Sequence, residues 1–258
     1  YGACDIKTDE ARKLGCQKIV HYGHTRFCDS NFPVEYVEYR EKADAVPILE
    51  RNYDLVRGFK SIGFVSSLQF SDAIPPARYF LEKKGHKVFV GEVNGKKHLY
   101  PGQVLGCDVS NATAIEDKVD AFLFLGCGKF HPLGLSLKQN KPIFALDFEK
   151  GNISKVDDSL FRKQKVMAKA LAKDARIFGI LVSTKQGQMN MKLAEELKRK
   201  LESAGRTAFI LALDEIRPEK LTGIKADCWV NTACPRIAIE NRTEFKLIVN
   251  PDELGNIV

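Results

Sequence analysis

The sequence predicts an α/β protein built from three similar small domains with parallel sheets. Apolar runs of strand length alternate with helical segments along the 258 residues, which is typical of parallel sheets covered by helices. An internal repeat is the second observation, because Cys4 and Cys107 each begin a segment that passes through a helix to an apolar run ending in glycine. A repeat of this kind indicates a unit in which the cysteine has a fixed place.

Composition restricts the class of protein further. Hydrophobic residues make up 44% and charged residues 28% of the chain, as in an ordinary globular protein, and the longest apolar runs are too short to span a membrane. The net charge of +7 is spread along the chain and would suit an acidic or nucleic-acid-associated partner. Many proteins are as basic without such a partner, so we predict no direct binding of nucleic acid. Seven cysteines without a visible secretion signal favour a reducing cytoplasm over a disulfide framework.

The first predicted domain covers residues 1–52. A short helical segment at 9–14 ends at Gly15, and two strands are expected at 17–22 and 34–39. Residues before Cys4 supply no opening strand and helix, and the sequence begins with Tyr1. We therefore expect the natural chain to start earlier.

The second predicted domain covers residues 53–150 and is more complete. Strands are expected at 61–66, 87–91, 121–126 and 142–147, and helices at 71–84 and 112–118. Pro75 and Pro76 lie where a first helical turn tolerates proline. A hydrophilic stretch at 94–103 leads to Cys107, so this domain would supply the second cysteine of the repeat.

The third predicted domain covers residues 151–258 and begins with a connecting helix at 158–173. Strands are expected at 176–183, 207–213, 228–232 and 245–250, with a helix at 188–204 and a helical turn at 218–221. The helix is stopped by Gly205. The third strand delivers Cys234 to a point where Pro235 cannot continue the ladder.

Cys4, Cys107 and Cys234 thus occur once in each predicted domain, at intervals of roughly 100 to 130 residues, the length of one small domain. Ligands bind at the carboxyl ends of parallel strands, where these loops would place the thiols. Three thiolates suit an iron–sulfur cluster with one iron left open, or zinc. Buried, unreactive cysteines are the simpler alternative. Cys127 also ends a strand and is the strongest competing ligand.

The remaining cysteines and the histidines carry weaker signals. We interpret Cys16 and Cys228 as structural, and Cys28 follows no pattern. His21 and His24 flank a glycine turn at a strand end, and His131 has the corresponding place in the second domain, where hydrogen-bonding roles are commoner than catalysis. The chain contains neither a Walker A loop nor a G-x-G-x-x-G motif, so nucleotide phosphate binding has little support.

Five short motifs are distributed along the chain, and each alone is weak. The motifs are Tyr1-Gly2-Ala3-Cys4-Asp5, His21-Tyr22-Gly23-His24, Gly102-Gln103-Val104-Leu105-Gly106-Cys107, Gly128-Lys129-Phe130-His131 and Ala233-Cys234-Pro235-Arg236. Their combination is specific, and it resembles the diphthamide synthase family, in its archaeal first-step form, over the whole chain.

The resemblance implies three α/β domains around a central [4Fe-4S] cluster held by Cys4, Cys107 and Cys234. The family uses S-adenosylmethionine as co-substrate and cleaves its S–Cγ bond to give a 3-amino-3-carboxypropyl radical. The radical adds to a histidine of translation elongation factor 2, the first step of diphthamide biosynthesis. The family implies a homodimer and an electron donor that the sequence does not identify.

From loop position alone, we expect His24, Gln186 and Gln188 to contact S-adenosylmethionine. Two other functions remain open at this point. A quinolinate synthase-like enzyme would share the pattern of one cluster cysteine per domain. A non-catalytic partner subunit that only holds a cluster or zinc would share it as well.

Overall fold

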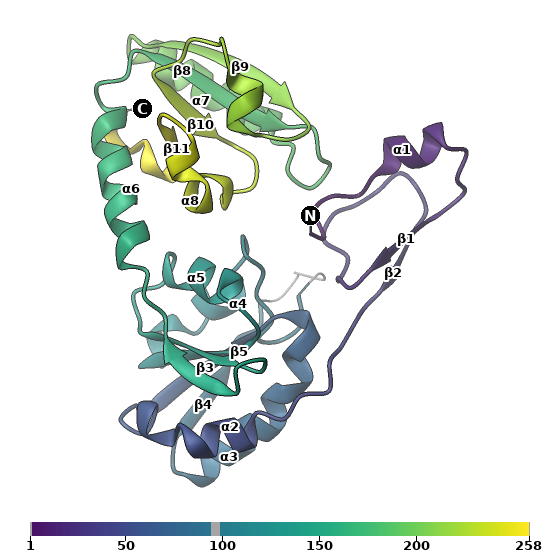
Figure 1. The fold of residues 1–258 in the computed structure, drawn as a ribbon, viewed down its shortest axis with the longest axis vertical. Helices are drawn as coiled ribbons and strands as arrows, with labels where there is room; N and C mark the ends of the chain where they lie inside the picture. The colour runs from purple at the N-terminus through teal and green to yellow at the C-terminus, as the bar shows by residue number, and fades with distance from the viewer. Residues whose placement is uncertain (1, 94–98, 258) are drawn as a thin grey trace. The chain divides into compact units, whose positions relative to one another are not determined.

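The computed structural model describes residues 2–93 and 99–257, and it contains three sheets (Figure 1). The chain forms two compact units. Unit 1 consists of Tyr1–Glu10 and Ser159–Val258, and unit 2 of Ala11–Asp158. Tyr1 and part of the hydrophilic stretch predicted at 94–103 lie outside the described residues. The division into three domains at residues 52 and 150 stays a prediction.

Unit 2 is built on a five-stranded sheet in the order β4-β3-β5-β6-β7. The strands β3 (Ser61–Ser66), β4 (Lys87–Val90), β5 (Ala121–Gly126) and β6 (Ile143–Asp147) are parallel, and β7 (Asn152–Lys155) is antiparallel to β6. All six residues of β5 are buried, which explains why its sequence is a continuous apolar run rather than an alternating one.

Helices pack on both faces of this sheet. On one face, α2 (Val46–Arg51) and α3 (Ile74–Lys83) contribute Leu49, Ala77 and Leu81 to a core with Phe64 and Leu123. On the other face, α4 (Ser110–Thr113) supplies Ala112 and α5 (Phe130–Ser136) supplies Leu135 to a core with Phe122 and Phe124. The loops after the parallel strands leave the sheet at its carboxyl edge, which is the ligand-binding edge in sheets of this class.

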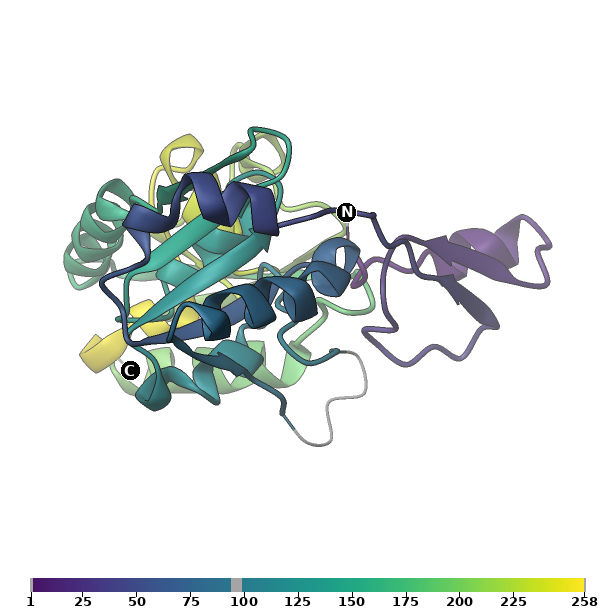
Figure 2. The ribbon, with the colours of Figure 1, turned by 90° about the horizontal axis from the view of Figure 1, so that it is seen from below.

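A small two-stranded sheet precedes these elements along the chain. After α1 (Thr8–Lys13), β1 (Ile19–Tyr22) pairs in parallel with β2 (Val34–Val37), and both views show the two strands side by side (Figures 1 and 2). The loop after β1 is attached to the rest of unit 2 because Gln69 Nε2 donates to Gly23 O at 2.8 Å and Gln103 Nε2 donates to Thr25 Oγ1 at 3.4 Å.

Unit 1 holds a four-stranded parallel sheet in the order β11-β10-β8-β9. Its strands are β8 (Ile177–Ser183), β9 (Thr207–Leu213), β10 (Cys228–Asn231) and β11 (Ile248–Val249). The helices α6 (Ser159–Ala172) and α7 (Met191–Ser203) share a core with Phe178 and Ile180, and α8 (Ile237–Glu240) joins a second core around Trp229.

The α/β class with parallel sheets is confirmed, and several elements have the predicted bounds. Strands β3, β5 and β9 and the 3₁₀ turn η4 (Pro218–Leu221) coincide with the predicted ranges. The predicted helix at 188–204 begins at Met191, because the side chain of Asn190 caps it by accepting from Leu193 N. Among the described residues, no helix is both long and apolar enough to cross a membrane.

Other elements differ from the prediction. The helix expected at 112–118 is α4 followed by a separate 3₁₀ turn (Glu116–Lys118), and the closing strand is reduced to Ile248–Val249. The elements α2, α5, α8 and β7 were not expected. The helix α5 contains Pro132 and Gly134. Because both residue types disfavour a helix, the sequence did not predict one here. Strand β7 has one buried residue, Ile153, so it carries almost no apolar signal.

Candidate metal centre

The loops that carry the predicted ligands in unit 1 leave the sheet at its switch point. Strand β8 lies between β9 and β10, so the chain turns to one side of β8 and then to the other. In such sheets the crevice at the carboxyl ends of the two diverging strands is the usual ligand site. Gln186 and Gln188 follow β8, and Cys234 follows β10. The fold therefore brings these three predicted residues to one edge.

Cys4 joins this edge although it lies far away in the sequence. Gly187 N donates to Cys4 O at 2.9 Å, and Gln188 Nε2 donates to Cys4 Sγ at 3.2 Å. Lys7 extends the contact, because its Nζ is 3.3 Å from Asp5 Oδ1 and 3.6 Å from Asp214 Oδ1. The N-terminal segment is thus bound to the four-stranded sheet of unit 1, although the strands that follow it in the chain belong to unit 2.

The loop of Cys234 is held by buried amides. Asn231 Nδ2 donates to Cys234 O at 2.9 Å, and Asn250 Nδ2 donates to Pro235 O at 3.0 Å. Burial raises the pKa of Cys234, the backbone N–H of Arg236 acts in the opposite sense, and the nearby Cys4 raises the pKa further. Cys4 and Cys234 therefore lie close enough to interact, and both are free, half-buried thiols.

Cys107 lies at the carboxyl edge of the sheet in unit 2. Gln103 forms a parallel bridge with Ser66, the last residue of β3, and Val104 N donates to Ser66 O at 2.8 Å. The segment continues past the end of that strand to Cys107, whose carbonyl accepts from Lys138 Nζ at 3.0 Å. Strand β3 is itself flanked by β4 and β5, so this edge is again a switch point.

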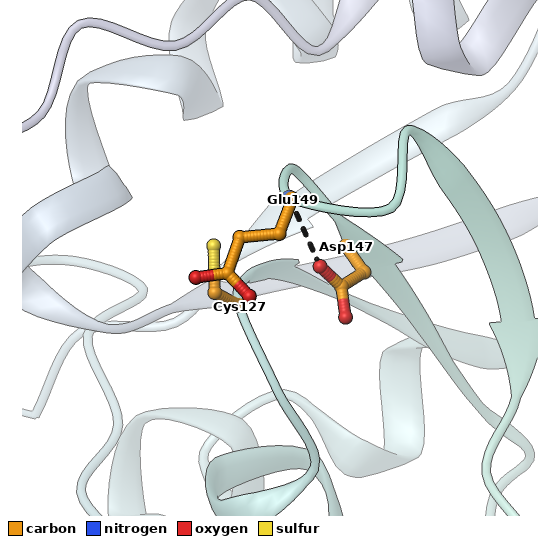
Figure 3. Close-up of side chains that lie close together, drawn as sticks. All are labelled: Cys127, Asp147 and Glu149. Carbon is orange, nitrogen blue, oxygen red and sulfur yellow. Dashed lines mark hydrogen bonds between the residues drawn. The ribbon is translucent and has the colours of Figure 1, made fainter.

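A second set of metal-ligand atoms lies at the ends of β5 and β6. Ligand atoms of Cys127, Asp147 and Glu149 are within 4.8 Å of one another (Figure 3). Burial raises the pKa of Cys127, and the two carboxylates add to this shift. Asp147 Oδ1 also accepts from Glu149 N at 3.1 Å and Lys150 N at 3.3 Å, so its carboxylate orders the turn between β6 and β7.

The sequence indicated Cys127 but not its two acidic neighbours. Gly126 is in register with Asp147 across β5 and β6, and this pairing places Cys127, the next residue, beside the acidic side chains. The acidic residue at the end of the 142–147 run is the one sequence signal for this cluster. It indicates a ligand beside Cys127 only if the two strands are known to be adjacent.

His21 and His24 form a separate pair within unit 2. His21 Nε2 and His24 Nδ1 are 3.1 Å apart, and the His21 ring centroid is 5.4 Å from that of Tyr36. Burial and the neighbouring His21 lower the pKa of His24. His131 instead stacks on Phe124 at 5.8 Å. His24 therefore belongs to unit 2 and Gln186 and Gln188 to unit 1, and the structure of either unit alone does not join all three predicted contacts.

A family profile described as "Putative diphthamide synthesis protein" matches residues 1–257. The chain belongs to this family. The chain is 30% identical over 257 residues to a 2-(3-amino-3-carboxypropyl)histidine synthase of Pyrococcus horikoshii, covering 98% of this chain and 74% of that protein. It is 31% identical to subunit 1 of the Caenorhabditis elegans synthase, covering 99% and 66% of the two chains, and 30% identical to the Homo sapiens subunit 1, covering 98% and 58%.

Solved structures of diphthamide synthesis proteins share the fold. A crystal structure of Dph2 from Pyrococcus horikoshii with a 4Fe-4S cluster has a TM-score of 0.89 at 30% identity, and covers 100% of this chain and 75% of that one. A second Dph2 structure from this organism has a TM-score of 0.90, with the same identity and coverage. The family resemblance read from the motifs is thus confirmed, and it is favoured over the quinolinate synthase-like alternative.

The two cysteines that we interpreted as structural, Cys16 and Cys228, differ in burial. Cys228 is fully buried in β10, as expected of a structural thiol, whereas Cys16 is exposed and packs into no core. Burial raises the pKa of Cys228 to about 12. Since the thiolate is the reactive form, Cys228 stays a protonated, inert thiol at neutral pH.

Alkylation with iodoacetamide at pH 8 is therefore expected to modify Cys16 within minutes and to leave Cys228 unmodified until the chain is unfolded. Peptide mass spectrometry in native buffer and in guanidinium measures both sites in one sample. Labelling of Cys228 at the rate of Cys16 in native buffer would contradict the burial that we describe.

Proposed function

We propose that this chain transfers the 3-amino-3-carboxypropyl group of S-adenosylmethionine to a histidine of translation elongation factor 2 by a radical mechanism, in the first step of diphthamide biosynthesis. The observation that carries the proposal is that Cys4, bound to the loop after β8, and Cys234, on the loop after β10, lie at the switch point of one sheet, in a chain of the diphthamide synthesis family. The names of the archaeal and animal relatives support the same activity.

The donor set fits a [4Fe-4S] cluster. Cys4, Cys107 and Cys234 form no disulfide and are partly accessible, and the thiols of Cys4 and Cys234 face N–H donors from Gln188 and Arg236. Such donors stabilise the negative charge of thiolates. Three protein thiolates leave one iron of a [4Fe-4S] cluster without a protein ligand. When bound, the cluster supplies the electron for cleavage of the S–Cγ bond.

The chain's own residues are suited to hold the co-substrate beside this centre. The loop 184–188 is fixed at its start, because Thr184 N donates to Leu213 O at 2.9 Å and the buried Lys185 donates through Nζ to Asp214 O at 2.8 Å. Near its end, Gly187 N donates to Cys4 O at 2.9 Å. A rigid loop keeps polar side chains at fixed positions. Gln186 in this loop and His24 in unit 2 remain our proposed contacts to S-adenosylmethionine.

The proposed reaction requires three partners. Elongation factor 2 is the protein substrate, an external donor supplies electrons, and a second copy of the chain completes a homodimer. The animal relatives are named as subunit 1 of a synthase, so a non-catalytic, cluster-holding subunit is the second candidate function. The presence of all three cysteines favours the enzyme.

Product analysis separates these functions. Breaking the S–Cγ bond of S-adenosylmethionine leaves 5′-methylthioadenosine, whereas breaking the bond to the adenosyl carbon leaves 5′-deoxyadenosine. We expect the anaerobically reconstituted, dithionite-reduced chain to form 5′-methylthioadenosine and to add one 3-amino-3-carboxypropyl group to unmodified elongation factor 2, detected by peptide mass spectrometry. A chain that binds the factor but leaves S-adenosylmethionine intact would establish the non-catalytic function instead.

A further inference from the structure

We propose that Gln188 is a positioning residue that donates an N–H···S hydrogen bond to the cluster ligand Cys4 and thereby raises the reduction potential of the centre. The inference rests on the proposed function, because it assumes that Cys4 holds the cluster. It gives Gln188 a role other than the contact to S-adenosylmethionine expected from its loop position.

The geometry of the side chain carries the proposal. Gln188 Nε2 lies 3.2 Å from Cys4 Sγ, a short separation for a sulfur acceptor. An amide nitrogen can only donate, and a cysteine sulfur accepts more strongly once it is an ionised ligand. The amide is therefore directed at the ligand atom.

The backbone around Gln188 keeps the amide in this place. Gly187 N donates to Cys4 O at 2.9 Å, and Gln188 N donates to Lys185 O at 2.9 Å. A Cβ at Gly187 would lie 2.7 Å from Cys4 Cα and 2.8 Å from Cys4 O, closer than two non-bonded atoms can pack. Only glycine permits this approach, so the loop and the Cys4 segment form one preassembled structure.

A donor in this position has a definite electrostatic effect. Reduction adds negative charge to a cluster and to its thiolate ligands, and hydrogen bonds to the sulfurs stabilise that charge. Loss of the Gln188 amide is therefore expected to make the centre harder to reduce. Retention of all three cysteines should leave the iron content unchanged.

The test uses the full chain with its cluster reconstituted anaerobically. Redox titrations followed by electron paramagnetic resonance would compare wild type with Gln188→Met, which keeps the length of the side chain but lacks the donor. We expect a lower midpoint potential at equal iron content. Gln188→Glu, which replaces the amide nitrogen with an acceptor oxygen, is expected to lower the potential further. Gln17→Met, the same substitution at an exposed position, is the matched control.

A second readout does not depend on the potential. In wild-type protein with ¹⁵N-labelled glutamine, pulsed spectra of the reduced cluster should show coupling to an amide nitrogen, and Gln188→Met should lose it. An unchanged midpoint potential in Gln188→Met and Gln188→Glu would overturn the inference. Wild-type protein that holds the cluster but leaves S-adenosylmethionine intact would overturn the proposed function alone, because the potentials could still be compared.

Discussion

Replacement of Cys4, Cys107 or Cys234 by alanine is expected to abolish or destabilise the retention of about four irons per chain after anaerobic reconstitution. Each replacement would remove one of the three proposed ligands, and two of them, Cys4 and Cys234, lie on loops at the same edge of the sheet in unit 1. The effect is measured after desalting, as the iron and acid-labile sulfide per chain and as the visible absorption band of the cluster. The three variants should behave alike.

Cys127→Ala is the matched control for this experiment. Cys127 is also half-buried at the carboxyl end of a parallel strand, but its neighbours are Asp147 and Glu149. We expect the variant to keep its iron. If iron depended on Cys127 and not on Cys107, or if the chain bound zinc in place of iron, the proposed ligand set would be wrong.

Glu253→Ala is expected to reduce the free energy of unfolding of unit 1 by roughly 3–5 kcal/mol, the cost of removing one partner of a buried ion pair. Arg242 Nη2 lies 2.7 Å from Glu253 Oε1 and 2.8 Å from Oε2, and Arg242 Nη1 donates to Ile248 O at 3.0 Å. Both side chains are buried. The substitution would therefore leave a guanidinium in the interior without its carboxylate.

The single tryptophan, Trp229, reports this unfolding, because it lies in the core of unit 1. Its emission during urea denaturation follows unit 1 separately from unit 2. Asp252→Ala is the control, since Asp252 pairs with Lys165 at 2.7 Å but is 66% exposed, and an exposed pair contributes at most about 1 kcal/mol. Equal losses in the two variants would show that burial of the pair is not the cause.

The strands could be predicted because their signal is local. Buried strands such as Ala121–Gly126 and Thr207–Leu213 are apolar runs bounded by glycine or polar residues, and this pattern needs no knowledge of neighbours. Elements stabilised mainly by tertiary contacts were missed. The helix Val46–Arg51 is defined by Ile48 and Leu49 in the core of unit 2, and the edge strand Asn152–Lys155 by its pairing with β6.

The candidate site divides in the same way. The repeat and the strand ends indicated Cys4, Cys107 and Cys234, and loop position indicated Gln188. Periodicity could not reveal that Gln188 Nε2 meets Cys4 Sγ, because the two residues lie 184 positions apart in the sequence. Nor could it reveal Asp147 and Glu149 beside Cys127, since that group depends on which strands are neighbours.

The sequence by itself determined the α/β class, the positions of most strands along the chain and the family, since apolar periodicity and short motifs are properties of neighbouring residues. The tertiary structure alone decided that Cys4 is bound to the four-stranded sheet of unit 1, beside Gln188 and close to Cys234. The physical reason is that strand order and loop packing are set by long-range burial and hydrogen bonding, as in the glycine-permitted approach of Gly187 to the backbone of Cys4. Residues far apart in the chain become one site only when the sheet is assembled.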